Sequence, residues 1–342
     1  MHLAALAFVL PAALALVLPA AAPPPPSTPI AVTEKPVAIK EWTVPWEKTR
    51  PRDPFVAPDG KVWFVGQTGN YVAYLEPTSG KFTRFTIPEG ANPHNLIVDR
   101  DGIVWYAGNR NGTIGRLNPA DGSVKEYRMP DASVRDPHTL VFDQAGDIWF
   151  TAQSGNVVGK LTRTTGDIRL VKMPIANSRP YGIVIDSRNR PWFNLFGTNA
   201  IGTVDPKTMA LRSFPLPNDR ARGRRIAITA DDMVWYVDYT RGYLGRLDPT
   251  TGKVQEWAAP SGAGSLPYAM TADDRGRLWF VETGVQPNRL VGFDPTSSQF
   301  FSVTPIAESG GLTVRHMVFH QPTRSLWFGT DANTIARATI SE

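Results

Sequence analysis

The stretch Asp147-Ile148-Trp149-Phe150-Thr151-Ala152 is one copy of a motif that recurs along the whole chain. Seven tryptophans are each followed by Phe or Tyr, and they are Trp63, Trp105, Trp149, Trp192, Trp235, Trp279 and Trp327. Successive members are 42 to 48 residues apart. A period of this length is typical of repeat architectures. We therefore interpret the chain as one ring of seven repeats and not as several small domains.

Each repeat contains four short β-rich runs. In the copy around Trp149 these runs are residues 139–143, 147–152, 157–161 and 168–173. Gly, Asn, Asp or Pro bounds each run, which is typical of a four-stranded antiparallel meander. The third run keeps a small residue, such as Gly115 or Gly159, which we expect to let adjacent blades approach closely. The sequence thus predicts an all-β, seven-bladed β-propeller.

The tryptophans themselves are expected in the core. Each lies between apolar neighbours at the same place in its repeat. At that place a large ring fills the wedge between neighbouring sheets. We therefore predict that they pack the blades and do not stack on a ligand.

The two ends of the chain complement each other. The last repeat stops at Glu342, just after its third run at residues 335–338. Residues 38–45 (AIKEWTVP) closely resemble residues 253–260 (KVQEWAAP), which form the fourth run of another repeat. A ring of sheets must join its ends, and this pairing removes an exposed edge. We predict that the N-terminal strand completes the last blade, and we expect a monomer.

Composition narrows the function classes. The 342 residues are 42% hydrophobic and 20% charged, as in an ordinary globular protein. The absence of cysteine excludes a disulfide framework, a thiolate metal site and a cysteine nucleophile. The net charge of +5 is modest and comes without a run of Lys and Arg, so we do not expect a nucleic-acid partner.

The first residues indicate export. Residues 3–22 are almost wholly apolar and end in three alanines, which is typical of a signal peptide. An uncleaved N-terminal anchor is the alternative, because about 20 apolar residues span a bilayer. Residues 23–36 form a Pro-rich linker, and the propeller occupies residues 37–342. We expect a periplasmic or secreted bacterial protein that contacts the membrane only through an uncleaved signal.

Aligning the repeats on their tryptophans reveals a ring of candidate site residues. Eleven positions before each tryptophan stand Arg52, His94, His138, Tyr181, Arg224, Tyr268 and His316. A propeller gathers equivalent positions around its central channel, so its site takes the form of such a ring. Histidine suits proton transfer near neutral pH. We take His94 and His138, with Asp136 beside the second, as the candidate catalytic group. A plug that hydrogen-bonds backbone groups is the alternative.

Arginines are concentrated in the loops that precede the same positions. Guanidinium groups suit carboxylates and phosphates, so we expect a basic channel mouth that binds an anionic small molecule. The alternative is that several of these side chains point into solvent. The candidate substrate-binding residues are Arg52, Arg135, Arg179, Tyr181, Arg224, Tyr268 and His316.

The elements Pro-His/Tyr, Asp/Asn-Gly, Trp-Phe, Asn-x-Ile-Gly-Arg and Glu-Tyr-x-x-Pro recur from about residue 37 onward. In this the chain resembles the virginiamycin B lyase (streptogramin B lyase) family. The resemblance implies a seven-bladed propeller and a Mg²⁺-dependent elimination that linearises a cyclic depsipeptide. The family's site combines histidines of two consecutive blades with a glutamate two residues before the second histidine and another after the same blade's Trp-Phe. These four positions are matched here by His94, His138, Asp136 and Ala152.

The resemblance implies His138 as the base, His94 as proton donor or orienting group, and Asp136 as partner of a metal or of a histidine. Glu282 and Asp238 stand at the Ala152 position of other repeats and are further candidate Mg²⁺ ligands. Two functions remain open. One is an exported carbon–oxygen lyase acting on a lactone, an ester or an anion. The other is a non-catalytic propeller that binds an anionic ligand or a protein. A lactone hydrolase is a third, weaker interpretation.

Overall fold

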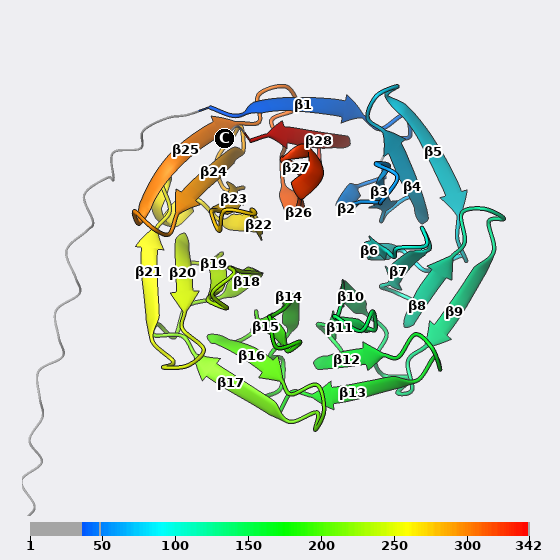
Figure 1. Cartoon of the computed structure of the whole chain (residues 1–342), viewed down its shortest axis with the longest axis horizontal. Coiled ribbons are helices and arrows are strands. Elements are labelled where there is room, and N and C mark those ends of the chain that lie inside the picture. Colours follow the sequence, from blue (N-terminus) through cyan, green and yellow to red (C-terminus); the bar gives the residue numbers. More distant parts are fainter. Residues whose placement is uncertain (1–35, 48, 341–342) are drawn as a thin grey trace, which may run out of the picture.

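The computed structural model describes residues 36–47 and 49–340. The predicted export segment and the linker up to residue 35 lie outside the described residues. The described chain forms seven four-stranded sheets arranged in a ring (Figure 1). Neighbouring strands within each sheet are antiparallel. The predicted seven-bladed all-β propeller is therefore confirmed.

Six blades follow the order of the chain from the innermost strand outward. The first three are β2 (Pro51–Val56), β3 (Val62–Gly66), β4 (Tyr71–Glu76) and β5 (Lys81–Thr86); β6 (Pro93–Val98), β7 (Val104–Gly108), β8 (Thr113–Leu117) and β9 (Val124–Arg128); and β10 (Pro137–Phe142), β11 (Ile148–Ala152), β12 (Val157–Leu161) and β13 (Ile168–Lys172). The next three are β14 (Pro180–Ile185), β15 (Pro191–Leu195), β16 (Ala200–Val204) and β17 (Leu211–Pro215); β18 (Gly223–Ile228), β19 (Val234–Asp238), β20 (Tyr243–Leu247) and β21 (Val254–Ala258); and β22 (Pro267–Ala272), β23 (Leu278–Glu282), β24 (Arg289–Asp294) and β25 (Gln299–Pro305).

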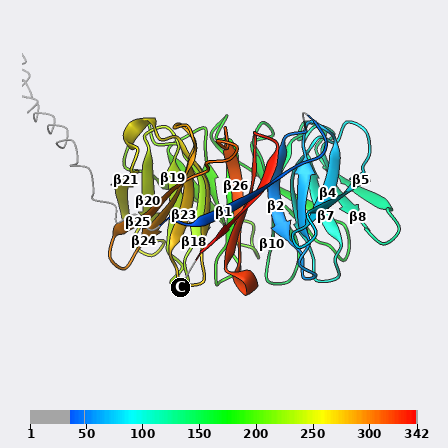
Figure 2. The same ribbon diagram turned by 90° about the horizontal axis from the view of Figure 1, so that it is seen from above.

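The seventh blade joins both ends of the described chain. It consists of β26 (Val314–His320), β27 (Ser325–Thr330), β28 (Thr334–Thr339) and β1 (Ala38–Thr43). Two short 3-10 turns, η1 (Gly262–Gly264) and η2 (Gln321–Thr323), lie in loops. The side view shows the strands crossing the ring between its two faces (Figure 2). Within the described residues there is no helix with the length and apolar character of a membrane span.

Strand β1 closes the ring as predicted. It pairs antiparallel with β28, with Ala38 opposite Thr339 and Thr43 opposite Thr334. The rings of Trp42 and Trp327 stack with centroids 5.5 Å apart. The closure therefore combines main-chain hydrogen bonds with a buried aromatic contact across the two ends of the chain.

The seven repeated tryptophans are core residues, as predicted. Each is at most 3% exposed. Several indole N–H groups donate to the side chain six residues earlier, as in Trp105 to Asp99 (3.0 Å) and Trp192 to Asp186 (2.9 Å). A buried indole N–H usually finds a hydrogen-bond partner, and for these tryptophans the residue directly after the inner strand supplies it. The repeated motif therefore serves to pack the core of each blade.

The small residue of the third strand has a different role from the predicted one. A Cβ atom on Gly115 would lie 2.0 Å from the Tyr106 ring, and one on Gly159 would lie 2.2 Å from the Phe150 ring. Each glycine pairs directly with that aromatic residue within the same sheet. The glycine therefore makes room for the aromatic ring that follows the tryptophan in its own blade. The predicted close approach of adjacent blades is therefore not the reason for a glycine at this position.

All seven innermost strands contain a register irregularity near their start. In β10 it lies between Pro137 and Leu140, and the other six inner strands repeat it at the equivalent place. A bulge of this kind inserts an extra residue and re-aims the side chains around it. Because the irregularities coincide with the predicted ring of site residues, each blade can direct two consecutive side chains toward the channel.

Deletion of residues 37–45 should unfold the protein or cause it to self-associate. The deletion removes β1 and leaves the backbone of β28 as an unpaired edge. Size-exclusion chromatography and thermal unfolding would measure this. A truncated monomer with an unchanged melting temperature would contradict the closure of the ring by β1.

A point variant separates the aromatic contact from the main-chain pairing. Trp42→Ala should destabilise folding by about 3–5 kcal/mol, because the buried ring leaves a cavity beside Trp327. Thr43→Ala, an exposed position in the same strand, is the matched control and should change stability by less than about 0.5 kcal/mol.

Candidate functional site in the channel mouth

The ring of residues predicted from the repeat alignment lies around the channel, at the start of the inner strands. The rings of His94 and His138 have centroids 3.5 Å apart, and the His138 and Tyr181 centroids are 4.3 Å apart. The hydroxyl groups of Tyr181 and Tyr268 are hydrogen-bonded to each other. The Arg224 guanidinium carbon lies 3.7 Å from the centroid of the Tyr268 ring. Residues from five different blades therefore meet in one cluster.

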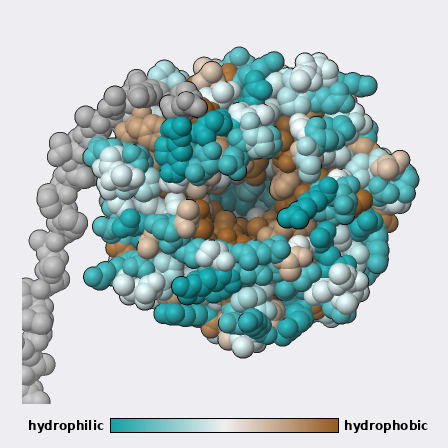
Figure 3. Space-filling model, in the orientation of Figure 1, coloured by the Kyte–Doolittle hydropathy of each residue, from teal (hydrophilic) through white to brown (hydrophobic). Residues whose placement is uncertain are grey.

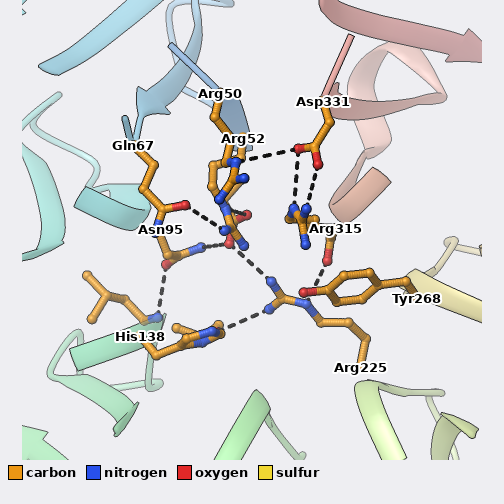
Figure 4. A network of polar contacts seen from close by, with 12 residues as sticks. Arg50, Arg52, Gln67, Asn95, His138, Arg225, Tyr268, Arg315 and Asp331 are labelled. Atoms are coloured by element: carbon orange, nitrogen blue, oxygen red, sulfur yellow. Dashed lines mark hydrogen bonds and ion pairs between the residues drawn. The ribbon is translucent and has the colours of Figure 1, made fainter. Parts of the chain in front are cut away.

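A buried ion-pair network crosses the channel beside this ring (Figure 4). Asp53 accepts hydrogen bonds from Arg52 Nε at 2.9 Å, from Asn95 Nδ2 at 3.1 Å and from Arg225 Nη2 at 3.2 Å. All four residues are at most 4% exposed. Burial alone would raise the pKa of Asp53, but Arg52 and Arg225 outweigh it and hold that pKa well below its usual range. Asp53 is therefore ionised and joins three blades.

Arg225 extends the network to two further blades. Its Nη1 donates to Thr139 Oγ1 at 3.1 Å, and its Nε donates to the carbonyl oxygen of Arg315 at 2.9 Å. A guanidinium can do this because its five N–H groups point outward in a fixed plane. Arg225 thus ties β18 to β2, β10 and β26 across the centre of the ring.

Repeat alignment alone did not identify several members of the network. Asp53, Asn95, Thr139 and Arg225 each lie one residue after the aligned ring position, in or beside the bulge of their inner strand. A strictly alternating strand would turn that next residue away from the channel. The available signal was a second polar residue directly after the aligned one, in several repeats.

The site holds more guanidinium groups than carboxylates. Arg52 and Arg225 share Asp53, and Arg315 pairs with Asp331. Arg224 makes no ion pair within residues 36–47 and 49–340. Arg50 also contacts Asp331, at 3.9 Å, so five cations face two anions.

Aromatic rings surround the unpaired Arg224. Its guanidinium carbon is 4.1 Å from the Tyr239 ring centroid and 4.9 Å from that of Phe196, in addition to its contact with Tyr268. The electron-rich faces of these rings stabilise the cation without neutralising its charge. Arg224 is also only partly buried, which leaves it accessible to an anion.

The three histidines of the ring are neutral. Burial, followed by the nearby guanidinium groups, lowers the pKa of His94 and His138 well below 6.5 and lowers that of His316 to about 3. The predicted base His138 is 0% exposed and its Nδ1 contacts Thr139 Oγ1 at 2.8 Å. A proton gained by His138 would lie close to Arg225, so this imidazole is a weak base in the present arrangement.

The candidate metal ligands Asp136, Asp238 and Glu282 anchor loops. Each accepts backbone N–H groups of its own blade: Asp136 from Ser154 (2.6 Å) and Gly155 (2.9 Å), Asp238 from Arg222 (3.0 Å), and Glu282 from Ser261 (2.8 Å). Among the residues that the structure describes, no group of three or more His, Asp or Glu side chains is placed to hold a metal ion. The three carboxylates therefore do not fit a Mg²⁺ site.

Two predicted substrate-binding arginines lie apart from the cluster. Arg135 and Arg179 are exposed, in the loops that precede β10 and β14. Arg52, Tyr181, Arg224, Tyr268 and His316 line the channel instead. The structure thus separates a set of buried or partly buried binding residues from two that lie at the rim.

Further along the inner strands the channel becomes apolar. A cavity of about 520 Å³ is lined there by side chains such as Phe55, Val141, Ile185 and Met270, with Arg225 and His316 also on its wall. The space-filling view shows hydrophobic residues along the central hollow (Figure 3). The channel therefore has a polar part and an apolar part, separated at the level of the Asp53–Arg225 pair.

This architecture defines a seven-bladed propeller with an arginine-rich site at the start of its inner strands. Residues 37–340 match the Virginiamycin B lyase family, and the chain belongs to that family. A comparison with curated protein sequences gave no match.

Solved structures agree with the family assignment. Virginiamycin B lyase from Staphylococcus aureus is 27% identical with a TM-score of 0.80, over 89% of this chain and 99% of that one. A catalytically inactive histidine-to-alanine variant of that enzyme, with quinupristin, matches equally well, at 27% identity and a TM-score of 0.80 over 89% and 99% of the two chains. The WD40 propeller of Doa1, at 12% identity and a TM-score of 0.69 over 88% and 98% of the chains, shares the fold alone.

The stability of the protein should fall as pH decreases from about 6.5 to 4.5. Unfolded histidines have a pKa of about 6.5, whereas the three channel histidines have lower values when folded. Their contribution is therefore complete above pH 6.5 and is lost toward acid pH, by up to about 1.4 kcal/mol per pH unit for each histidine. Urea unfolding at several pH values measures this slope.

Single histidine variants test the origin of the slope. His316→Asn should remove the uptake of about one proton on unfolding, which reduces the slope of the unfolding free energy by up to about 1.4 kcal/mol per pH unit. His320→Asn, which removes a partly exposed histidine near η2, is the control and should reduce it less. An unchanged slope in His316→Asn would show that this histidine is not held neutral in the folded protein.

Proposed function

We propose that this protein is a carbon–oxygen lyase whose substrate is an anion bound in the channel mouth by its carboxylate or ester carbonyl group. The observation that supports this most directly is that five guanidinium groups face only two carboxylates in the cluster. Uncompensated charge is costly to bury, so an anionic ligand would stabilise the site. Family membership supports the reaction type.

The chemistry follows from where charge develops. Removal of a proton from the carbon next to a carbonyl group places negative charge on the carbonyl oxygen. Guanidinium groups already oriented toward that oxygen stabilise this charge in the transition state. Arg224 and Arg315 suit this role because both are partly exposed and lie beside the same tyrosine, Tyr268. The reaction that we propose uses arginines for this purpose, since the carboxylates of the site do not form a metal-binding set.

Binding without catalysis is the second candidate function. The observation that favours it is Ala152, which is buried at the position where the family resemblance implies a glutamate. In that case the chain would retain the basic mouth and bind an anionic ligand or an acidic protein segment there. Both candidate functions use the arginines to bind the ligand. They differ only in whether the protein converts that ligand to a product.

We also propose export to the periplasm or the medium, on the basis of residues 1–22 alone. Their apolar run and small-residue end support a signal peptide or an anchor. Fractionation of cells that produce the full chain, with N-terminal sequencing of the product, tests this. A cytoplasmic product with an intact N-terminus would contradict it.

Citrate, a small tricarboxylate, should bind to the purified protein with an affinity that falls as salt concentration rises. Arg224→Ala should weaken this binding at least about tenfold, which is the effect expected for loss of one charge-assisted hydrogen bond. Isothermal titration calorimetry measures it. Arg135→Ala removes an equal charge from an exposed loop and is the matched control, with less than about a twofold effect.

The same protein should be incubated with quinupristin, with simple lactones and with a uronate oligosaccharide, and assayed for the new carbon–carbon double bond by its ultraviolet absorbance.

Equal citrate binding by both arginine variants and the parent protein would refute the assignment of the anion-binding site to Arg224. Citrate binding without turnover of any compound would favour the second candidate function.

A further inference from the structure

Two tyrosines of the site form a buried pair whose chemistry differs from that of the other channel residues. Tyr181 on β14 and Tyr268 on β22 come from blades that are not adjacent, since the β18 blade lies between them. Their hydroxyl groups are hydrogen-bonded, and their rings lie 6.1 Å apart at 50°. They are 4% and 1% exposed. A proton can therefore pass directly from one phenol to the other.

Cations surround this pair on several sides. Arg224, from the blade between the two tyrosines, lies 3.7 Å from the Tyr268 ring centroid and 5.4 Å from that of Tyr181. Arg225 lies 5.3 Å from the Tyr181 ring centroid and Arg315 lies 5.8 Å from that of Tyr268. Guanidinium groups at these distances stabilise a phenolate much more than a phenol.

The other groups that face the pair do not offset this charge. The neutral His138 lies 4.3 Å from the Tyr181 ring centroid, and Tyr239 lies 5.8 Å from that of Tyr268. The nearby carboxylates Asp53 and Asp331 are already bound to Arg52, Arg225 and Arg315. A negative charge on one of the two phenol oxygens would therefore offset part of the excess positive charge of the cluster.

The electrostatic balance differs between the two tyrosines. Burial opposes ionisation of Tyr268, but Arg224 and the other guanidinium groups outweigh it and lower its pKa to about 8. Burial, together with the charge of Tyr268, raises the pKa of Tyr181. Above about pH 8 the pair therefore holds a single proton, on Tyr181, with the negative charge on Tyr268.

We propose that Tyr268 is the proton acceptor and Tyr181 the proton donor of the elimination, and that the substrate is a carboxylate with an oxygen substituent on its β carbon. This rests on the proposed lyase function and assigns its base to the tyrosine pair in place of His138. The class of substrate follows from Arg224, which is partly exposed, covers the Tyr268 ring and has no carboxylate partner in the described chain. Arg224 lies within 5.4 Å of both tyrosine ring centroids, so a carboxylate that pairs with it is brought to the tyrosine pair.

The step balances without a further reactant. The Tyr268 oxygen takes the proton from the carbon next to the carboxylate, and the electrons of that C–H bond form the new C=C bond. The bond between the β carbon and its oxygen breaks, and the electron pair leaves on that oxygen, which takes the proton of the Tyr181 hydroxyl. The proton on Tyr268 then moves to Tyr181 through their hydrogen bond. The products are an unsaturated carboxylate and an alcohol, and the pair returns to its initial state.

Ultraviolet difference titration tests the pair independently of any substrate. The parent protein should show one tyrosine that ionises near pH 8, well below the ordinary value of about 10. Tyr268→Phe should remove this step. Tyr239→Phe removes a neighbouring phenol outside the pair and is the matched control, so it should retain the step. Absence of any tyrosinate below about pH 9 in the parent protein would overturn the assignment.

Kinetics with a 4-linked uronate oligosaccharide test the catalytic role. Tyr268→Phe should lower kcat at least about 100-fold, the effect typical of losing a general base, while citrate affinity changes less than about threefold. Tyr181→Phe should also lower kcat and should shift the pH at which Tyr268 ionises. His320→Asn, at the last residue of β26 and away from the cluster, is the control and should retain the activity.

The outcomes separate this proposal from the lyase function itself. Turnover that survives in Tyr268→Phe but is lost in His138→Asn would overturn the tyrosine assignment and leave the lyase function intact. Absence of uronate turnover in the parent protein, with salt-sensitive citrate binding retained, would overturn the catalytic role and the substrate class while supporting the binding function.

Discussion

The pairing of β1 with β28 is the constraint on which the remaining structure depends. It joins strands from the two ends of the described chain and adds the Trp42–Trp327 stack to the main-chain hydrogen bonds. The polar network requires each blade to hold a fixed position around the channel, because a single carboxylate, Asp53, meets side chains from the β6 and β18 blades. An open ring would not hold these distances, so closure supports both the fold and the site.

The electrostatics of the channel show a site built at a cost in stability. Burying several guanidinium groups with fewer carboxylates is unfavourable unless each charge finds a partner. Asp53 serves two of the arginines, the histidines remain neutral, and aromatic rings cover Arg224. Residual positive charge remains beside the Tyr181–Tyr268 pair. Perturbed groups of this kind are concentrated at functional sites, which is why the channel mouth, and not the apolar cavity below it, supports the proposed chemistry.

Family membership and the local chemistry carry different information. The chain shares the propeller of the virginiamycin B lyases over nearly its whole described length. Ala152 and the loop-anchoring carboxylates nevertheless leave no metal-binding set among the described residues. Equivalent positions of a propeller can exchange residue types without disturbing the strands, since function depends on the site and not on the fold.

The sequence by itself determined the number of blades, the positions of their strands to within about two residues, the closure by β1 and the ring of residues around the channel. These follow from a regular period and from alternating apolar residues, which are local patterns that survive in the linear chain. Only the tertiary structure decided that Asp53 and Arg225 face the channel, that His138 is fully buried, and that Asp136 and Glu282 bind backbone N–H groups. The reason is physical: a bulge changes side-chain direction by one residue, and burial and hydrogen-bond partners come from segments far apart in the sequence.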